Sequence, residues 1–293
     1  MKQDVKKLII AKNIGFCFGV TKAVNLARKL LDKEKKLLCL GDLVHNAVVM
    51  DELKNKGFCV IKDTKSVKNA PFIIRSHGLP PSVLKEIKNS NVPIFDATCS
   101  FVKKVQNLVK TFAEKNFFIF LVGDSQHPEI QALKEIAGKN CLIISPYNPK
   151  VNKKITHKQC AIIAQTTLSS EMYKSAIKKI VEKFPDKDIE ILNTICPVSI
   201  KRQQEAKNLA KNTDLFLVVG GKKSSNTKKL FIIGKNINNN TYQIEKLSDL
   251  ENIEIEKFNK IGIISGASTD INFINILINN LKHTGYKKIT RRK

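Results

Sequence analysis

The sequence has 293 residues, of which 42% are hydrophobic, and a formal net charge of +25 at pH 7. The hydrophobic fraction is large enough for buried cores and excludes a wholly disordered chain. No apolar run reaches the roughly 18 residues of a membrane-spanning helix, and the run after residues 1–7 is too short for a signal peptide. We therefore expect a cytoplasmic protein with no membrane partner.

The predicted elements alternate between strands and helices, and they fall into three stretches that each begin near a cysteine. In the first stretch, Cys17 is followed by a helical pattern at residues 20–31, and a later helix is predicted at 81–88. Short apolar runs predict strands at 36–40, 58–61, 71–74 and 92–95. Polar loops with His45 and His77 follow the first and third of these strands.

The second stretch repeats this order after Cys99. Helical patterns cover 102–113, 130–137 and 171–184, and strands are predicted at 117–122, 141–144, 161–164 and 189–192. The loop after the first strand contains His127 and Glu129, and the loop after the third contains Thr167.

The third stretch begins at Cys196. Its predicted helices are 200–210, 227–233 and 271–281, and its predicted strands are 215–219, 241–244 and 261–264. The two loops contain Ser224, Ser225, Asn226 and Ser268. The closing strand is missing at the C-terminus, and we expect residues 8–11 to supply it, so that the chain is circular in plan.

The spacing within the three stretches indicates an internal repeat. The interval from cysteine to first loop is 28 residues for Cys17 to His45, 28 for Cys99 to His127 and 29 for Cys196 to Ser225. We predict an α/β fold of three similar small sandwich units, arranged as a pseudo-threefold trefoil around a central cluster cavity. The predicted units are residues 12–96, 97–193, and 194–293 together with 1–11.

The seven cysteines divide into two groups. In a reducing compartment disulfides are disfavoured, so metal-binding or catalytic roles gain weight. Four cysteines lie in or beside apolar runs, and we expect them to be small buried hydrophobic residues: Cys39, Cys59, Cys141 and Cys160. Cys17, Cys99 and Cys196 instead lie between a strand end and a helix N-terminus, where the helix dipole favours the thiolate.

The three junction cysteines and the six polar loops, two in each stretch, all follow predicted strand ends. Ligands of open parallel sheets bind beyond these ends, so we expect the positions to converge. Three thiolates could hold zinc, but a structural zinc site usually has a fourth protein ligand and often a C-x-x-C pair, which is absent. A [4Fe–4S] cluster on three cysteines, with one iron open to substrate, is the second option. Three buried thiols without metal are the third.

The loop residues suggest what binds beside a metal. Hydroxyl, amide and imidazole groups before helix N-termini suit a phosphate or diphosphate. Glu129 is the one carboxylate among them, and a buried glutamate beside a histidine could relay protons. Its alternative role is that of a first-turn acid that complements the helix dipole. His157 and His283 lie outside these loops, and we expect no function for them.

Nine short motifs in order carry a resemblance that covers nearly the whole chain. They are GFCFGV at Cys17, LVHN at His45, SHG at His77, DATC at Cys99, HPE at His127, QTTLS at Thr167, NTICP at Cys196, KSSNT at Ser225 and SGAS at Ser268. Together they resemble the 4-hydroxy-3-methylbut-2-enyl diphosphate reductase family, which catalyses the last step of the non-mevalonate (MEP) isoprenoid pathway.

The resemblance implies a reductase that removes the substrate hydroxyl as water and yields isopentenyl and dimethylallyl diphosphate. It implies a [4Fe–4S] cluster on Cys17, Cys99 and Cys196, with Glu129 as proton donor and Thr167 near the substrate hydroxyl. It also implies that the diphosphate is held by a set of loop residues: His45, His77, His127, Ser224, Ser225, Asn226 and Ser268. An acidic ferredoxin or flavodoxin is the expected electron donor, since the protein is basic.

Two rival functions are weighed against the reductase. A non-redox hydro-lyase would also use an open iron as a Lewis acid, but it would need no electron donor. A nucleic-acid-binding module would explain the charge of +25. However, the lysines are spread along the chain, no arginine-rich arm is present and tryptophan is absent, so we expect no nucleic-acid partner.

Overall fold

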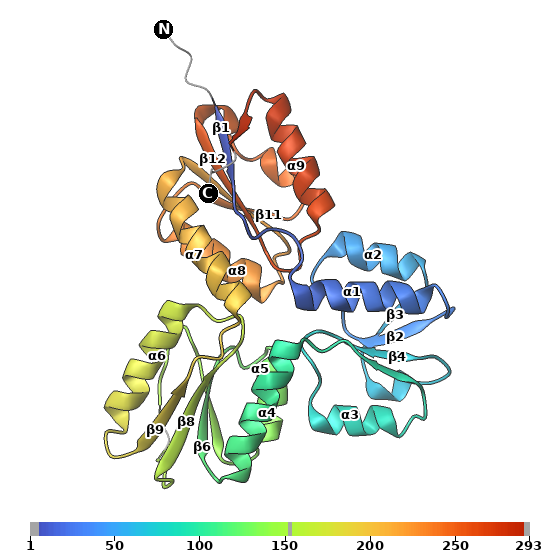
Figure 1. The fold of residues 1–293 in the computed structure, drawn as a ribbon, viewed down its shortest axis with the longest axis vertical. Helices are drawn as coiled ribbons and strands as arrows, with labels where there is room; N and C mark the ends of the chain where they lie inside the picture. Colours follow the sequence, from blue (N-terminus) through green and yellow to red (C-terminus); the bar gives the residue numbers. More distant parts are fainter. Residues whose placement is uncertain (1–5, 152–153, 290–293) are drawn as a thin grey trace. The chain divides into compact units, whose positions relative to one another are not determined.

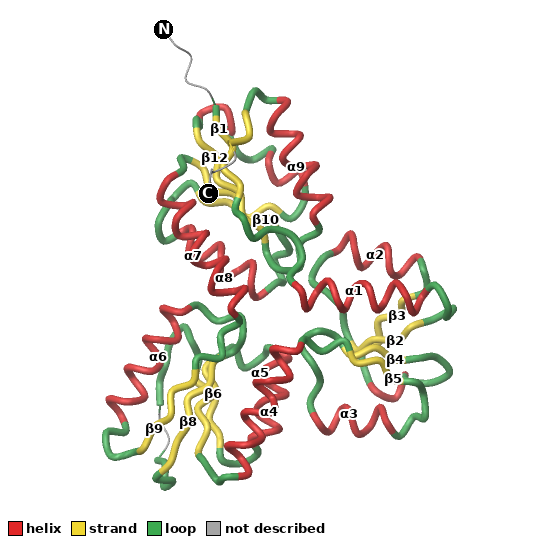
Figure 2. The backbone as a smooth tube through the Cα atoms, in the orientation of Figure 1, coloured by secondary structure: helices red, strands yellow, loops and turns green. Residues whose placement is uncertain are grey.

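The computed structural model describes residues 6–151 and 154–289 of the chain. It divides into two compact units, which are numbered here independently of the three units predicted from the sequence. The first is formed by Met1–Phe18, His45–Val49 and Pro197–Lys293, and the second by Gly19–Val44 and Met50–Cys196. The described part contains three all-parallel sheets with helices beside them (Figures 1 and 2), which confirms the predicted α/β class with three similar units. None of the helices in the described ranges is long and apolar enough to cross a membrane.

The first unit contains a five-stranded sheet of order β11-β10-β12-β1-β13. Its strands are β1 (Lys7–Ile10), β10 (Leu215–Val219), β11 (Thr241–Ile244), β12 (Lys260–Ser265) and β13 (Lys287–Ile289). Its helices are α7 (Pro197–Asn212), α8 (Ser225–Lys235) and α9 (Ile271–His283), with short 3₁₀ turns at Leu247–Leu250 and Ile255–Lys257. Both faces of the sheet are covered by helices, as parallel sheets require.

The N-terminal strand lies where the sequence predicts it. Strand β1 pairs in parallel with β12, with Leu8 opposite Ile261, and so takes the fourth position in this sheet. The structure corrects one expectation, because the C-terminus does provide a strand: β13 pairs with β1 as an additional edge strand. Lysines at residues 287 and 288 interrupt the apolar pattern there, which hides the strand in the sequence and suits an exposed edge.

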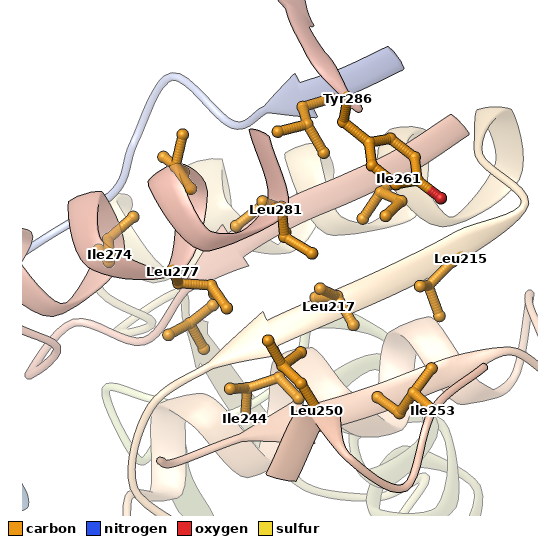
Figure 3. Packing of buried hydrophobic residues seen from close by; sticks show 14 residues of the cluster. Leu215, Leu217, Ile244, Leu250, Ile253, Ile261, Ile274, Leu277, Leu281 and Tyr286 are labelled. Carbon is orange, nitrogen blue, oxygen red and sulfur yellow. The ribbon is translucent and has the colours of Figure 1, made fainter. Parts of the chain in front are cut away.

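Helix α9 illustrates how the sequence determines a covering helix. The Asp270 carboxylate accepts a hydrogen bond from the Asn272 backbone N–H at 2.6 Å and caps the first turn. Apolar residues at helical spacing then face the sheet, so that Ile274, Leu277 and Leu281 pack among strand residues such as Leu217 (Figure 3). Helices α7 and α8 contribute to a separate core with Phe216 and Val218, whose side chains point to the opposite face of β10.

The second unit contains two four-stranded sheets. One has the order β3-β2-β4-β5, with β2 (Leu37–Leu40), β3 (Phe58–Ile61), β4 (Phe72–Ile74) and β5 (Ile94–Asp96), and the nearby helices α1 (Phe18–Leu31), α2 (Ala47–Asn55) and α3 (Pro81–Lys88). The other has the order β7-β6-β8-β9, with β6 (Phe118–Val122), β7 (Cys141–Ile144), β8 (Gln159–Ala164) and β9 (Asp188–Leu192). Helices α4 (Ser100–Glu114), α5 (Pro128–Ala137) and α6 (Ser170–Lys183) flank this sheet.

The first strand after each junction cysteine, β2, β6 or β10, takes the second position in its sheet, and β4, β8 or β12 takes the third. The strands that lead to the junction cysteines, β5, β9 and β1, take the fourth position, so the three orders are equivalent. The boundaries predicted for the three units, 12–96, 97–193 and 194–293 with 1–11, stay a prediction. The strand ends put the polar loops after β2 and β4, after β6 and β8, and after β10 and β12 at carboxyl edges of parallel sheets. In such sheets this is the edge at which ligands bind.

Candidate functional site

The three cysteines of the strand–helix junctions share one backbone arrangement. In each case the cysteine N–H donates to a carbonyl in the loop that follows the neighbouring strand: Cys17 to Ala267 at 2.9 Å, Cys99 to Ser76 at 3.0 Å and Cys196 to Thr166 at 2.8 Å. These backbone hydrogen bonds fix where each cysteine leaves its sheet. The repeat predicted from the sequence therefore extends to the hydrogen bonds of the cysteines.

The exposure of the seven cysteines separates the two predicted groups only in part. None of the seven, all of which lie in the described ranges, forms a disulfide. Cys39 and Cys160 are fully buried, as expected, and burial raises the pKa of the Cys39 thiol to about 12. Cys59 and Cys141 are half-buried rather than buried, although both pack against apolar cores. Cys17, Cys99 and Cys196 are also half-buried.

The donor chemistry of these three cysteines fits an iron–sulfur cluster, since clusters are held by cysteine thiolates. Gly19, at the start of α1, supports this fit, because a Cβ at that position would lie 2.8 Å from Cys99 Sγ. Cys17 belongs to the first unit, and Cys99 and Cys196 belong to the second. No group of three or more His, Cys, Asp or Glu side chains in the described ranges is placed to hold a metal ion, so the shared site stays a prediction.

Glu129 is the most distinctive ionisable group of the second unit. It lies in the first turn of α5 and is 1% exposed. Its Oε1 accepts a hydrogen bond from Thr166 N, and its Oε2 accepts one from Thr166 Oγ1, both at 2.7 Å. Burial raises the pKa of the Glu129 carboxyl to about 7, against the opposing effect of the two Thr166 bonds. The group therefore exchanges a proton close to neutral pH.

Two of the predicted histidines lie beside this carboxyl. His127 is the N-cap of α5, and its Nδ1 accepts a hydrogen bond from Glu129 N at 3.2 Å. In the neutral imidazole the proton is then on Nε2, which makes Nε2 the donor of this ring. The rings of His77 and His127 are 5.2 Å apart, edge to face. The structure thus brings His77, His127 and Glu129 together, as the loop positions suggest.

The two threonines of the loop after β8 have different hydrogen-bond partners. Thr166 bonds to the Glu129 carboxyl through its amide and its hydroxyl. Thr167 Oγ1 accepts a hydrogen bond from Gln165 Nε2 at 2.9 Å, and Gln165 Oε1 accepts one from Asp124 N at 3.0 Å. Gln165 therefore ties the loop after β6 to the loop after β8. Its place at the end of an apolar strand was the only signal for it in the sequence.

The first unit holds the serine and asparagine positions of α8. Ser224 is the N-cap, and its Oγ accepts from Thr227 N at 3.3 Å. Asn226 is 6% exposed, and its Oδ1 accepts from Ser199 Oγ at 3.4 Å. Its Nδ2 is buried and has no hydrogen-bond partner in the described structure. A buried amide donor without a partner is costly, so this atom is a strong candidate for a ligand contact.

Ser268 and His45 are also brought together in this unit. Ser268 Oγ donates to the His45 carbonyl at 3.4 Å, and Asn46 Nδ2 donates to the Ser268 carbonyl at 3.0 Å. Gly221 packs tightly here, since a Cβ would lie 2.8 Å from the His45 carbonyl oxygen. Backbone and side-chain groups of three loops therefore meet at one edge of the five-stranded sheet.

Comparisons with known proteins agree along the whole chain. Residues 8–282 match the LytB protein family. The 4-hydroxy-3-methylbut-2-enyl diphosphate reductase of Dictyoglomus thermophilum is 36% identical over 277 residues, which cover 94% of this chain and 96% of that protein. The reductase of the same name from Aquifex aeolicus is 34% identical over 267 residues, with 89% and 91% covered.

Two solved structures show the same similarity. The E-1-hydroxy-2-methyl-but-2-enyl-4-diphosphate reductase of Plasmodium falciparum has a TM-score of 0.89 and 27% identity, covering 99% of this chain and 93% of that one. A second structure is described as (E)-4-hydroxy-3-methyl-but-2-enyl diphosphate reductase, the terminal enzyme of the non-mevalonate pathway. It has a TM-score of 0.68 and 31% identity, with 95% and 99% covered. The chain belongs to the LytB protein family.

Proposed function

We propose that this chain is a 4-hydroxy-3-methylbut-2-enyl diphosphate reductase, an oxidoreductase of the non-mevalonate isoprenoid pathway. The substrate takes up two electrons and two protons, its C–O bond to the hydroxyl breaks, and water leaves. The products are isopentenyl and dimethylallyl diphosphate. Among the observations on this chain, the buried Glu129 carboxyl supports the proposal most directly, because a reductive loss of water needs a group that delivers a proton.

Glu129 is proposed as that proton donor. A carboxyl with a pKa of about 7 is protonated in a large fraction of molecules at neutral pH, whereas an ordinary glutamate is not. The two bonds from Thr166 hold the carboxyl in one orientation. Thr167, in the same loop and bonded to Gln165, is proposed to lie near the substrate hydroxyl, as the resemblance implies.

The diphosphate is proposed to bind to neutral donors and imidazole groups. The proposed contacts are those of the sequence: His45, His77, His127, Ser224, Ser225, Asn226 and Ser268. The free Nδ2 hydrogens of Asn226 support this assignment, since a ligand oxygen would satisfy them. The helix N-termini of α5 and α8 add the positive ends of their dipoles.

Cys17, Cys99 and Cys196 are proposed to hold a [4Fe–4S] cluster. When bound, the cluster supplies the electrons and an iron site for the substrate hydroxyl. Half-buried thiols without disulfide partners suit this role. We further propose that an acidic ferredoxin or flavodoxin delivers the electrons in the cytoplasm, because a net charge of +25 would attract such a partner.

The first experiment is anaerobic purification followed by visible absorption and iron analysis. We expect a brown protein with about four irons per chain, and loss of this signal in Cys17→Ser, Cys99→Ser and Cys196→Ser. Cys59→Ser, at a half-buried thiol outside the junctions, is the matched control and should keep the cluster. A folded protein that stays colourless after anaerobic reconstitution would overturn the cluster.

The second experiment separates the reductase from a hydro-lyase. Purified protein is mixed with substrate with and without a chemical reductant such as dithionite, and the five-carbon products are quantified. We expect product only with the reductant. Product formation without any electron source would contradict the proposed reaction, whatever metal the protein contains.

A further inference from the structure

The loop that leads to Cys17 is longer than the loops that lead to the other two junction cysteines. Strand β1 ends at Ile10 and leaves residues 11–16 before Cys17. Strand β5 ends at Asp96 and leaves only residues 97 and 98 before Cys99, and β9 ends at Leu192 and leaves residues 193–195 before Cys196. A longer loop has more conformations to lose, so a fixed position for Cys17 needs additional anchors.

The two short loops are held by groups of their own or neighbouring strands. The Asp96 carboxylate accepts a hydrogen bond from Thr98 N at 2.8 Å. Thr194 Oγ1 bonds to both the N–H and the carbonyl of Ala164, at 2.8 and 2.7 Å. Lys103 of α4 also pairs with the Asp96 carboxylate, at the end of the strand rather than on the backbone of the short loop.

The long loop is held by two side chains of α7. The Glu205 carboxylate accepts from Asn13 N at 3.0 Å and from Asn13 Nδ2 at 2.8 Å. One turn earlier, Arg202 Nη2 donates to the Gly15 carbonyl at 2.7 Å, and Arg202 Nη1 donates to the Ser265 carbonyl at 2.6 Å. Residues three apart on a helix lie on the same face, so both anchors reach the same loop.

The Arg202 guanidinium joins the loop to the end of β12. Ser265 Oγ also accepts a hydrogen bond from Gly15 N at 2.8 Å, so Gly15 is held at both its amide and its carbonyl. Arg202 is 2% exposed, and burying a guanidinium is costly unless its donors are satisfied. Its rigid planar fork suits two carbonyl acceptors in a way that a lysine ammonium does not.

The result is a regular pattern of hydrogen bonds from the backbone N–H groups of the loop. Asn13 N is bound by Glu205, Gly15 N by Ser265, and Cys17 N by the Ala267 carbonyl. Gly15 has φ +78°, a left-handed conformation that favours glycine and turns the chain toward Cys17. Every second residue of the segment is thus fixed, and the last of them is the cysteine.

We propose that Arg202 and Glu205 are positioning residues that fix the Cys17 thiol for metal binding, at the end of a loop longer than those of Cys99 and Cys196. The proposal rests on the proposed function, since it assigns the purpose of the fixed loop to cluster binding. Both side chains act through the loop, at Asn13 and Gly15. Loss of either anchor should therefore affect Cys17 and leave the other two cysteines unchanged.

The test begins with the metal-free protein, so that it does not depend on a cluster. Hydrogen exchange followed by mass spectrometry reports the opening of residues 11–18, and the segments around Cys99 and Cys196 serve as internal references. Alkylation by iodoacetamide, quantified for each cysteine peptide, reports how freely each thiol moves. The variants are Glu205→Gln and Arg202→Lys, with Gln204→Ala, at an exposed position of the same helix, as control.

We expect Glu205→Gln to speed exchange at residues 11–18 by about tenfold, because the amide loses a charged acceptor. The rate at which iodoacetamide alkylates Cys17 should change together with this exchange rate, while Cys99 and Cys196 keep their wild-type alkylation rates. Arg202→Lys should show a larger change, because one ammonium cannot replace the fork. Should Arg202→Lys fail to fold, Glu205→Gln, at a half-buried residue, still tests the proposal.

After anaerobic reconstitution, the variants should bind less iron per chain, and the electron paramagnetic resonance spectrum of the bound cluster should differ from that of the wild type. Equal exchange and alkylation at all three cysteines in wild type and variants would overturn the proposal. A wild type that binds no cluster would instead refute the proposed function, and the comparison of the metal-free proteins would then show whether the two anchors fix Cys17.

Discussion

Helices α5 and α8 begin at equivalent places after the first strand of two repeated sheets, and their N-caps are His127 and Ser224. The second residue beyond each cap is Glu129 in α5 and Asn226 in α8. Both are buried polar groups, 1% and 6% exposed. In the remaining repeat the equivalent residue is Val48, after the Asn46 cap of α2, and it is 68% exposed.

The two buried groups differ in how they are satisfied. Both oxygens of Glu129 accept hydrogen bonds from Thr166, whereas Asn226 Nδ2 is buried with no partner in the described structure. At one of these equivalent positions the protein itself satisfies the side chain and so sets the properties of an acid. At the other, the amide nitrogen lacks a hydrogen bond that a ligand can make. The repeat supplies the scaffold, and single residues specialise it.

The largest effect is expected from Glu129→Gln, which keeps the size of the side chain but removes its proton. The rate constant kcat should fall roughly 10²- to 10⁴-fold, as for the loss of a general acid. Iron content and visible absorption should match those of the wild type. Glu114→Gln, at an exposed residue on α4, is the control and should keep full activity. Wild-type turnover in Glu129→Gln would remove the acid from the mechanism.

The pH dependence of folding tests the buried acid without any substrate. Because the folded-state pKa of Glu129 is about 7 and the model-compound value is 4.5, its contribution to stability is full below pH 4.5 and is lost as the pH rises through 7. Between pH 5 and pH 8 the metal-free wild type should lose about 2 to 3 kcal/mol more unfolding free energy than Glu129→Gln does. Urea denaturation at the two pH values measures this difference, and parallel losses in both proteins would contradict it.

Asn226→Ala tests the amide that lacks this hydrogen bond. The KM for the diphosphate substrate should rise roughly 5- to 150-fold, the equivalent of one unmade bond to a charged ligand. The free energy of unfolding should change by less than about 1 kcal/mol, because the side chain gives up a single 3.4 Å bond, from Ser199, among the described residues. Asn239→Ala, at an exposed site, is the control. A normal KM with a clear loss of stability would make Asn226 a structural residue.

The sequence predicts the repeated framework well, because its signals are local. Buried parallel strands appear as short apolar runs, such as residues 118–122, and the repeat of cysteine and loop intervals reveals the order of the elements. Even the pairing of β1 with β12 follows from counting the elements of each unit. Strand β13 escapes this reasoning, since Lys287 and Lys288 conceal it.

The site is predicted less completely, because its contacts depend on turns. In the QTTLS stretch, nothing in the sequence indicates that Thr166 bonds to Glu129 through both its amide and its hydroxyl. Arg202 and Gln203 of α7 are buried polar residues, so they weaken the apolar pattern that would reveal a core-facing stripe. An arginine on a helix is normally expected at the surface, and only the fold shows that Arg202 joins two carbonyls.

The smallest effect separates the two threonines. Thr166→Val removes the hydroxyl bond to Glu129 Oε2, which favours the charged carboxylate, so the pKa of Glu129 should rise further. The alkaline limb of the rate profile, where the acid loses its proton, should then move to higher pH by roughly one unit. Thr167→Val loses the bond from Gln165 and leaves both Thr166 bonds to Glu129 in place, so it is the matched control, with an unmoved limb. If the limb moved only in Thr167→Val, the acid would be coupled to the substrate through Thr167. The conclusion that Thr166 sets the properties of Glu129 would then be wrong.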